Sequence, residues 1–273
     1  MARPVRQEEL VSLLEYLSTH LPGSIRVLNI AQNLVEGRCD SQQFWVDQWP
    51  HPRAILVTIV PGKFARNRVE VWALDSDCLK WLLEHVIDWT QDVFVIGIQL
   101  KFKRTLLSCV PQPDKITFSA DDQTVFLWPA GRQPPDNVEL PEGLRLGRLR
   151  PEHAATVTAN WRHATNPAKT RNFIICLIQN FHSSCLLDEH GTMVGYCAQY
   201  HYGAIGFLHV EPAYRRRGLA TIMLKDMIRQ IADTGRQPYL LVESYNTASM
   251  DLVSKLGFQM FEKPLCFAVW KAS

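Results

Sequence analysis

The chain has 273 residues, 47% of them hydrophobic, and a formal net charge of +2 at pH 7. A chain of this length can bury one large core or two ordinary ones. The small net charge argues against a broad field for binding nucleic acid or a membrane surface. No apolar run approaches the roughly 20 residues that a membrane-spanning helix needs. We therefore expect a globular protein of one or two domains, with no nucleic-acid partner and no membrane span.

Seven cysteines are scattered along the chain, and their number is odd. No Cys-x-x-Cys pair occurs, which is typical of free thiols in a reducing compartment, and no Cys/His set has the pattern of a zinc site. The first 20 residues carry two arginines but also three glutamates, whereas cleaved mitochondrial presequences are poor in acids. We expect an intracellular protein in a reducing compartment, with no signal peptide and no metal site.

The first part of the chain alternates helical and strand patterns. Leucines share one face of the first helix, and short apolar runs indicate strands. The expected elements are a helix over 7–20, strands over 54–60 and 69–74, a helix over 77–88 and a strand over 93–100. This alternation predicts an α/β or α+β domain over residues 1–133.

Prolines and glycines gather between residues 129 and 143, and this composition predicts a linker over 134–143. The second domain is expected over 144–273. Its predicted elements are a strand over 144–149, helices over 151–163 and 169–181, strands over 185–188, 193–202 and 205–210, a helix ending near 235, and strands over 239–242 and 265–271. This order predicts a mixed sheet with helices on its faces.

The most distinctive segment is LHVEPAYRRRGLA, from Leu208 to Ala220. It is typical of a strand end, a turn with Arg215, Arg216 and Arg217, and a glycine, Gly218, that opens an amphipathic helix. The first amides of a helix have no intrahelical partner and lie at the positive end of its dipole. A glycine lets a bulky anion approach the backbone. The segment therefore predicts a phosphate-binding site, with neither the dinucleotide fingerprint nor the P-loop pattern.

The spacing Arg215-x-x-Gly218-x-Ala220, introduced by Val210-x-Pro212, resembles the pyrophosphate loop of the GNAT superfamily of N-acetyltransferases. A second motif, NTASMDLVSKLGF from 246 to 258, is similar to the Asn-initiated helix that ends in Gly-Phe in these enzymes. SSCLLDEHGTMVGY (183–196), EPAYRRRG, LVESYN, LPGSIRVLNI (21–30) and WVDQWP (45–50) resemble the glycine N-acyltransferase-like family. The resemblance covers most of the chain.

The resemblance implies a GNAT fold in the second domain, which is a mixed, partly splayed sheet with helices on both faces. The amino-terminal α/β domain would be of the glycine N-acyltransferase-like type, and a degenerate GNAT-like copy is one interpretation of it. The implied cosubstrate is acyl-CoA or acetyl-CoA, without a metal. Its pantetheine arm would pair with the backbone of the strand end, and its pyrophosphate would lie on the loop. The implied binding residues are Leu208, His209, Val210, Arg215, Arg216, Arg217, Gly218, Leu219, Ala220, Thr221 and Asn246.

The usual proton-transfer positions of the superfamily are apolar in this chain. Family members carry a carboxylate or histidine eleven or nine residues before the first arginine of the loop, and these positions are Ala204 and Gly206. Val253 stands where many relatives place a phenol that protonates the leaving thiolate. The reaction then needs no side-chain base, or the base has moved, or activity is lost.

Glu243, at the end of the strand over 239–242, is the candidate for a relocated catalytic base; a solvated strand-end acid is the alternative interpretation. Strand parity places His209 on the face opposite residues 204 and 206, so it is interpreted as a packed histidine. His201 and Tyr202 lie at a turn and are candidates for lining a pocket mouth. Arg162 is a candidate for gripping an acceptor carboxylate.

The sequence thus predicts an acyl-CoA-dependent N-acyltransferase that moves an acetyl or larger acyl group to a small amine by direct attack. Glycine or another amino acid is the candidate acceptor. Two alternatives stay open: a protein or peptide N-acetyltransferase, and a non-catalytic protein that binds acyl-CoA.

Overall fold

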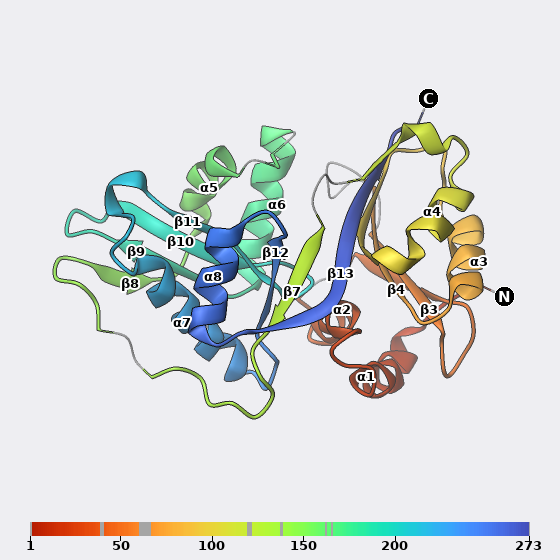
Figure 1. Cartoon of the computed structure of the whole chain (residues 1–273), viewed down its shortest axis with the longest axis horizontal. Coiled ribbons are helices and arrows are strands. Elements are labelled where there is room, and N and C mark those ends of the chain that lie inside the picture. Colours follow the sequence, from red (N-terminus) through yellow and green to blue (C-terminus); the bar gives the residue numbers. More distant parts are fainter. Residues whose placement is uncertain are drawn as a thin grey trace. The chain divides into compact units, whose positions relative to one another are not determined.

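A computed structural model describes residues 2–38, 41–59, 67–118, 122–136, 139–161, 163–164 and 166–272. The chain forms two compact units, each built from sheet and helices (Figure 1). Unit 1 comprises Met1–Thr124, Glu243–Tyr245 and Glu262–Ser273, and unit 2 comprises Val125–Val242 and Asn246–Phe261. These units are assembled from different segments than the predicted domains 1–133 and 144–273, because the end of the chain pairs with strands of unit 1.

The sheet of unit 1 follows the order β1-β2-β3-β4-β5-β13, and β6 also pairs with β13. Strands β4 and β5 are parallel, and the other pairs are antiparallel. The strands are β1 (Arg3–Pro4), β2 (Gln42–Val46), β3 (Ala54–Ile59), β4 (Asn67–Ala73), β5 (Val93–Gln99), β6 (Ile116–Phe118) and β13 (Gln259–Trp270). The helices are α1 (Leu10–Ser18), α2 (Ile25–Val35), α3 (Ser76–Val86) and α4 (Lys103–Cys109), with short 3-10 turns at Gln7–Glu9, Leu100–Phe102 and Pro113–Lys115.

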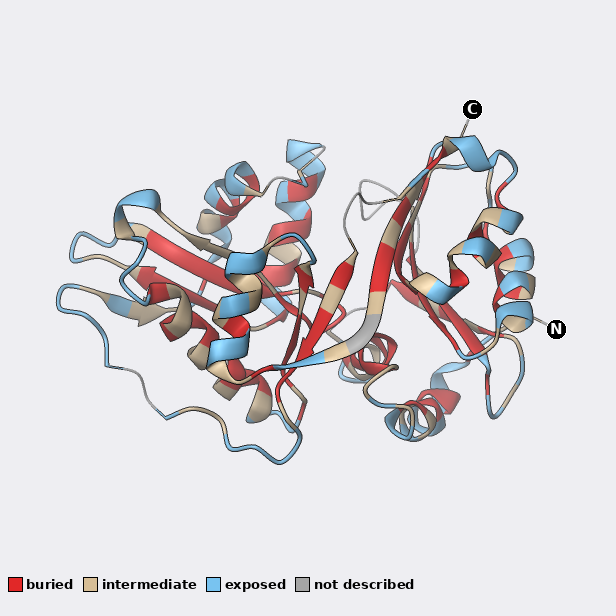
Figure 2. Ribbon diagram, viewed as in Figure 1, coloured by how far each residue is buried: buried red, intermediate tan, exposed pale blue. Residues whose placement is uncertain are grey.

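The core of unit 1 lies between its sheet and helix α3, whose leucines Leu79, Leu82 and Leu83 are fully buried. Figure 2 shows buried residues along the strands and exposed residues on the outer sides of the helices. The helix begins at Asp75, whose carboxylate accepts hydrogen bonds from the amides of Asp77 and Cys78. Core packing and a side-chain cap thus produce the helix that the sequence predicts over 77–88.

A buried ion pair fastens α2 to the sheet of unit 1. Arg26 pairs with Glu70 of β4 and donates to the carbonyls of Gly97 (2.7 Å) and Ile96 (2.8 Å). Gly97 has φ +67°, and a Cβ there would lie 1.6 Å from Arg26 Nη1. Glycine is required at this position because the guanidinium fills the space.

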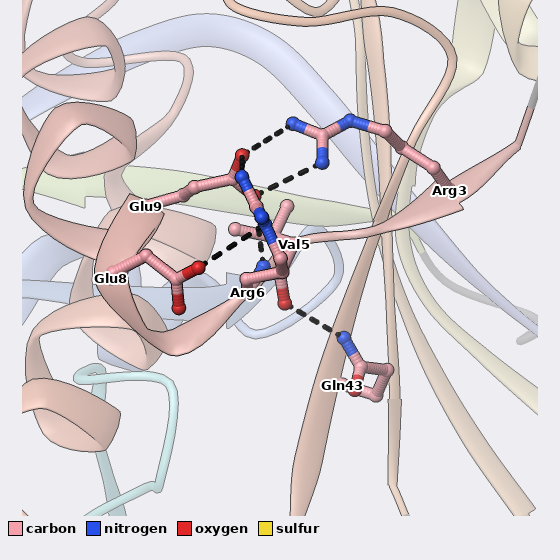
Figure 3. A network of polar contacts seen from close by, with 6 residues as sticks. All are labelled: Arg3, Val5, Arg6, Glu8, Glu9 and Gln43. Atoms are coloured by element: carbon pink, nitrogen blue, oxygen red, sulfur yellow. Dashed lines mark hydrogen bonds and ion pairs between the residues drawn. The ribbon is translucent and has the colours of Figure 1, made fainter.

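A second polar network holds the amino terminus, and Figure 3 shows its members. The Glu9 carboxylate accepts two hydrogen bonds from Arg3, at 3.1 and 2.9 Å, and further bonds from the amide and guanidinium of Arg6. These donors lower the pKa of Glu9 to about 2. The Gln43 side chain of β2 donates to the carbonyl of Val5. The network ties β1 to the start of α1.

The sheet of unit 2 follows the order β7-β12-β11-β10-β9-β8, with β11 and β12 parallel and β8 to β11 antiparallel. Its strands are β7 (Gln123–Leu127), β8 (Arg145–Gly147), β9 (Ser183–Leu187), β10 (Met193–Gln199), β11 (Ile205–Val210) and β12 (Tyr239–Glu243). Its helices are α5 (Ala154–Asn160), α6 (Pro167–Asn180), α7 (Leu219–Ala232) and α8 (Thr247–Leu256), with 3-10 turns at Pro151–His153 and Pro212–Tyr214.

Helix α7 packs on one face of this sheet through its apolar stripe, including Leu219, Met223 and Met227, which meets Ile205 and Leu240. Helix α6 buries Phe173, Ile174 and Leu177 and contacts β10. The described residues of the predicted linker 134–143 lie outside helices and strands. The mixed sheet with covering helices matches the predicted fold class.

Candidate functional site

The loop between β11 and α7 presents a series of unpaired backbone amides. Gly218 stands at the N-cap of α7 with φ +75°, and Arg216 also has a positive φ of 65°. Among the described residues, no acceptor pairs with the amides from Arg216 to Thr221. A Cβ built on Gly218 would meet nothing within 4 Å, so the space in front of the loop is open. Unpaired amides at the start of a helix are suited to binding an anion.

The three arginines of the loop are exposed, but two of them have defined contacts. Arg215 Nε donates to the carbonyl of Val210 at 2.9 Å and ties the loop to the end of β11. The Arg217 guanidinium lies 5.3 Å from the centre of the Tyr214 ring. Arg215 therefore shapes the loop, and all three residues supply positive charge beside the open amides.

Strand β11 separates from β12 after one residue pair. Their parallel register joins Ile205 with Leu240 and extends no further in the part of the chain described. The backbone of Leu208–Val210 on the side facing away from β10 therefore has no strand partner among these residues. The resemblance implies that the pantetheine arm pairs with this backbone, and that role stays a prediction.

A β-bulge interrupts β11 in the same place. Ala198 of β10 pairs with Gly206, whereas Tyr196 pairs with His209, so β11 carries one extra residue between these pairs. Phe207 has φ +54°, which marks the distorted residue. Directly paired residues point to the same face of a sheet, so Gly206 and His209 share a face. The predicted parity, which placed His209 on the opposite face, is wrong because the bulge shifts it by one.

The two usual base positions are enclosed by protein atoms. Ala204 is 1% exposed, and its carbonyl accepts a hydrogen bond from the amide of Tyr200 at 2.8 Å. A Cβ on Gly206 would lie 2.3 Å from the ring of Tyr200. That ring stacks on Tyr202 (4.9 Å between centroids) and packs on Phe207 (4.4 Å). Aromatic packing thus occupies the place where relatives carry a carboxylate or histidine.

The Asn-initiated helix is formed as predicted. The Asn246 side chain caps α8 by accepting a hydrogen bond from the amide of Ser249 at 3.1 Å. The helix ends at Gly257, whose φ is +103°. Val253, at the position where many relatives carry a phenol, is buried in the core of unit 2 and packs α8 against it. A contact of Asn246 with the cosubstrate stays a prediction.

Glu243 is the last residue of β12, and its carboxylate accepts a hydrogen bond from the Tyr245 hydroxyl at 3.0 Å. Glu243–Tyr245 groups with unit 1, whereas the loop from 211 to 221 belongs to unit 2. The role of Glu243 as a relocated base stays a prediction.

His209 has the contacts of an oriented imidazole. Its Nε2 lies 3.2 Å from Glu211 Oε1 and 3.4 Å from Asn160 Nδ2. The ring stacks on Tyr196 at 5.3 Å, with 21° between the planes. Its side chain is 22% exposed. In the sequence, this arrangement is indicated only by the pattern His-x-Glu over 209–211. The bulge and the position of Asn160 depend on the fold and could not be predicted from the sequence.

His201 and Tyr202, the candidates for lining a pocket mouth, do not have the predicted exposure. His201 and Tyr202 are buried, at 2% and 6% exposed, so they do not line a pocket mouth. Both pack inward because Tyr202 stacks on Tyr200 and the His201 ring lies against Phe173. Arg162 lies outside the described residues.

The thiols in the core of unit 2 are unsuited to covalent catalysis. Burial raises the pKa of Cys185 to about 11 and raises that of Cys197 further. A protonated thiol is a poor nucleophile. Within the described ranges, no group of acidic, histidine and cysteine side chains could hold a metal ion, and no helix is long and apolar enough to cross a membrane.

Comparisons with known proteins identify the class. A solved X-ray structure of a Drosophila protein matches with a TM-score of 0.79 at 19% identity, covering 98% of each chain. A structure titled as a tandem GNAT protein from the clavulanic acid biosynthesis pathway matches with a TM-score of 0.59 at 14% identity, covering 100% of this chain and 98% of that chain. These likenesses define the GNAT fold.

The family follows from two family models and from curated relatives. Residues 2–182 match the model described as aralkyl acyl-CoA:amino acid N-acyltransferase, and residues 185–266 match the model described as FR47-like protein. Glycine N-acyltransferase of Mus musculus is 23% identical over 296 residues, with 99% of each chain covered. That of Bos taurus is 24% identical, with 88% of this chain and 89% of the relative covered. The chain belongs to the aralkyl acyl-CoA:amino acid N-acyltransferase family and is an N-acyltransferase.

Proposed function

We propose that the enzyme transfers an acyl group from acyl-CoA or acetyl-CoA to the amine of a small acceptor, with glycine or another amino acid as the candidate. The observation that carries the proposal is the series of unpaired amides from Arg216 to Thr221 in front of the open space at Gly218. The names of the mouse and bovine relatives, glycine N-acyltransferase, support the choice of acceptor.

The loop amides would bind the pyrophosphate of the cosubstrate, with the exposed arginines adding positive charge. The unpartnered backbone of Leu208–Val210 would pair with the pantetheine arm and direct the thioester toward the bulge at Phe207. Asn246, at the start of α8, would face the same arm. Backbone donors near the thioester carbonyl would stabilise the negative charge that develops on its oxygen.

Direct attack fits the surroundings better than a covalent acyl-enzyme. The amine would attack the thioester carbonyl through a tetrahedral intermediate, because burial keeps Cys185 and Cys197 protonated.

The six described cysteines are free thiols, which supports a reducing compartment, mitochondrial or cytoplasmic, as part of the proposal.

Thiol release tests this function. The full-length protein is incubated with acetyl, longer-chain and aromatic acyl-CoA donors, each with glycine, other amino acids or a peptide amine. We expect release of free thiol that depends on a small amino acid. Preference for a peptide amine would favour the protein acetyltransferase alternative. Binding of CoA without release for any amine would favour the sensing alternative, which the apolar base positions motivate.

A further inference from the structure

The bulge in β11 brings a histidine onto the face of the sheet where proton transfer is needed. Gly206 and His209 pair with Ala198 and Tyr196, which lie two residues apart on one face of β10. Two residues of a strand span about 7 Å. The His209 side chain therefore emerges about that far along the same face from the usual base position at Gly206, where the Tyr200 ring excludes any side chain.

The contacts of His209 define which ring nitrogen can accept a proton. An ionised Glu211 can only accept a hydrogen bond. With a proton on Nε2, the ring donates to Glu211 at 3.2 Å, and the 3.4 Å approach of Asn160 Nδ2, which is itself a donor, is then a contact without a hydrogen bond. The other nitrogen, Nδ1, has no partner in the described part of the chain. Stacking on Tyr196 fixes the plane of the ring. A carboxylate that orients an imidazole through one nitrogen and leaves the other nitrogen open is the arrangement of a general base.

We propose that His209 Nδ1 accepts the proton of the attacking amine and that Glu211 positions the ring. This inference rests on the proposed acyl transfer. The amine nitrogen forms a bond to the thioester carbonyl carbon, and its proton moves to Nδ1, directly or through one water molecule. The carbon–sulfur bond then breaks, and the thiolate takes the proton from the imidazolium. Atoms and charges balance without a further reactant.

The first test compares His209→Gln with His190→Gln in the full-length enzyme. His190 is a matched control because it lies on the turn between β9 and β10 with its side chain 80% exposed. We expect kcat of His209→Gln to fall roughly 10²–10⁴-fold at neutral pH, the usual contribution of a general base, with CoA affinity by calorimetry unchanged. His190→Gln should behave as the wild type. Added imidazole should restore part of the rate of His209→Ala, which a merely structural role would not produce.

The second test uses the pH profile of kcat. The groups facing the imidazole are Glu211 after β11, Tyr196 from β10 and Asn160 from α5. A general base must be unprotonated to act, so the wild-type profile should have an acid limb that His209→Gln lacks. An acid limb that persists in His209→Gln would overturn the inference, and so would an unchanged kcat in Glu211→Gln if the His209 variants fail to fold.

The outcomes separate this inference from the function on which it rests. A wild-type enzyme that releases thiol, with His209→Gln keeping its rate and acid limb, would overturn the inference and leave the function standing. Loss of rate in Glu243→Gln alone would assign the base to Glu243 instead. A folded wild-type protein that releases no thiol with any amine would overturn both.

Discussion

Replacing Gly218 by valine should abolish tight CoA binding while destabilising the fold only modestly. Gly218 has φ +75°, and a Cβ there would meet no protein atom within 4 Å. The folded state therefore carries only the backbone strain of a left-handed residue, about 1–2 kcal/mol. In the complex, the new side chain would project into the space proposed for the pyrophosphate. Losing two charge-assisted hydrogen bonds would cost about 3–6 kcal/mol, or roughly 10²–10⁴-fold in affinity.

The same helix supplies a matched control at its other end. Gly235 follows α7, has the same φ of +75°, and would also place its Cβ in open space. Gly235→Val should therefore lose about the same thermal stability and keep its CoA affinity. Calorimetric titration with CoA and thermal unfolding measure the two quantities separately. Equal CoA affinity in Gly218→Val and Gly235→Val would refute the assignment of the loop.

Three further predictions follow from single residues. Asn246→Ala removes the cap of α8 and should lose about 1 kcal/mol of unfolding free energy together with CoA affinity. The control Asn166→Ala removes the similar cap of α6 and should lose stability alone. Intact CoA affinity in Asn246→Ala would leave Asn246 with only the capping role. Glu243→Gln should keep its rate at neutral pH and its CoA affinity, because His209 is the proposed base; a rate lower by roughly 10²–10⁴-fold with CoA affinity intact would assign the base to Glu243 instead. Glu9→Gln should be less stable than the wild type at neutral pH, because the pKa of Glu9 is lowered in the folded state. This difference in urea unfolding should shrink as the pH falls from 4.5 through about 2, and a difference as large at pH 2 as at pH 7 would contradict that cause.

The elements that carry the site were predictable from the sequence because their signals are local. Strand β11 has the predicted bounds, and the apolar stripe and the glycine at the start of α7 identify that helix. The cap at Asn246 depends only on the next three residues. Such features need no knowledge of the rest of the fold.

Features that depend on distant partners were missed. Helix α2 buries Arg26, Asn29 and Asn33, so its inner face breaks the apolar periodicity that indicates a helix. The face predicted for the His209 side chain on β11 was wrong because the bulge depends on the pairing of β11 with β10. The packing of Tyr200 against Gly206 and the contact of Asn160 with His209 likewise arise only when the strands and α5 come together.

The central claim is that this chain transfers an acyl group to a small amine at the loop of unit 2. Amine-dependent release of free thiol from acyl-CoA by the wild-type enzyme tests it most directly, with Gly218→Val as the paired variant. We expect release that requires a small amino acid and that falls with CoA affinity in Gly218→Val. Tight CoA binding by the wild type without release for any donor and amine would contradict it.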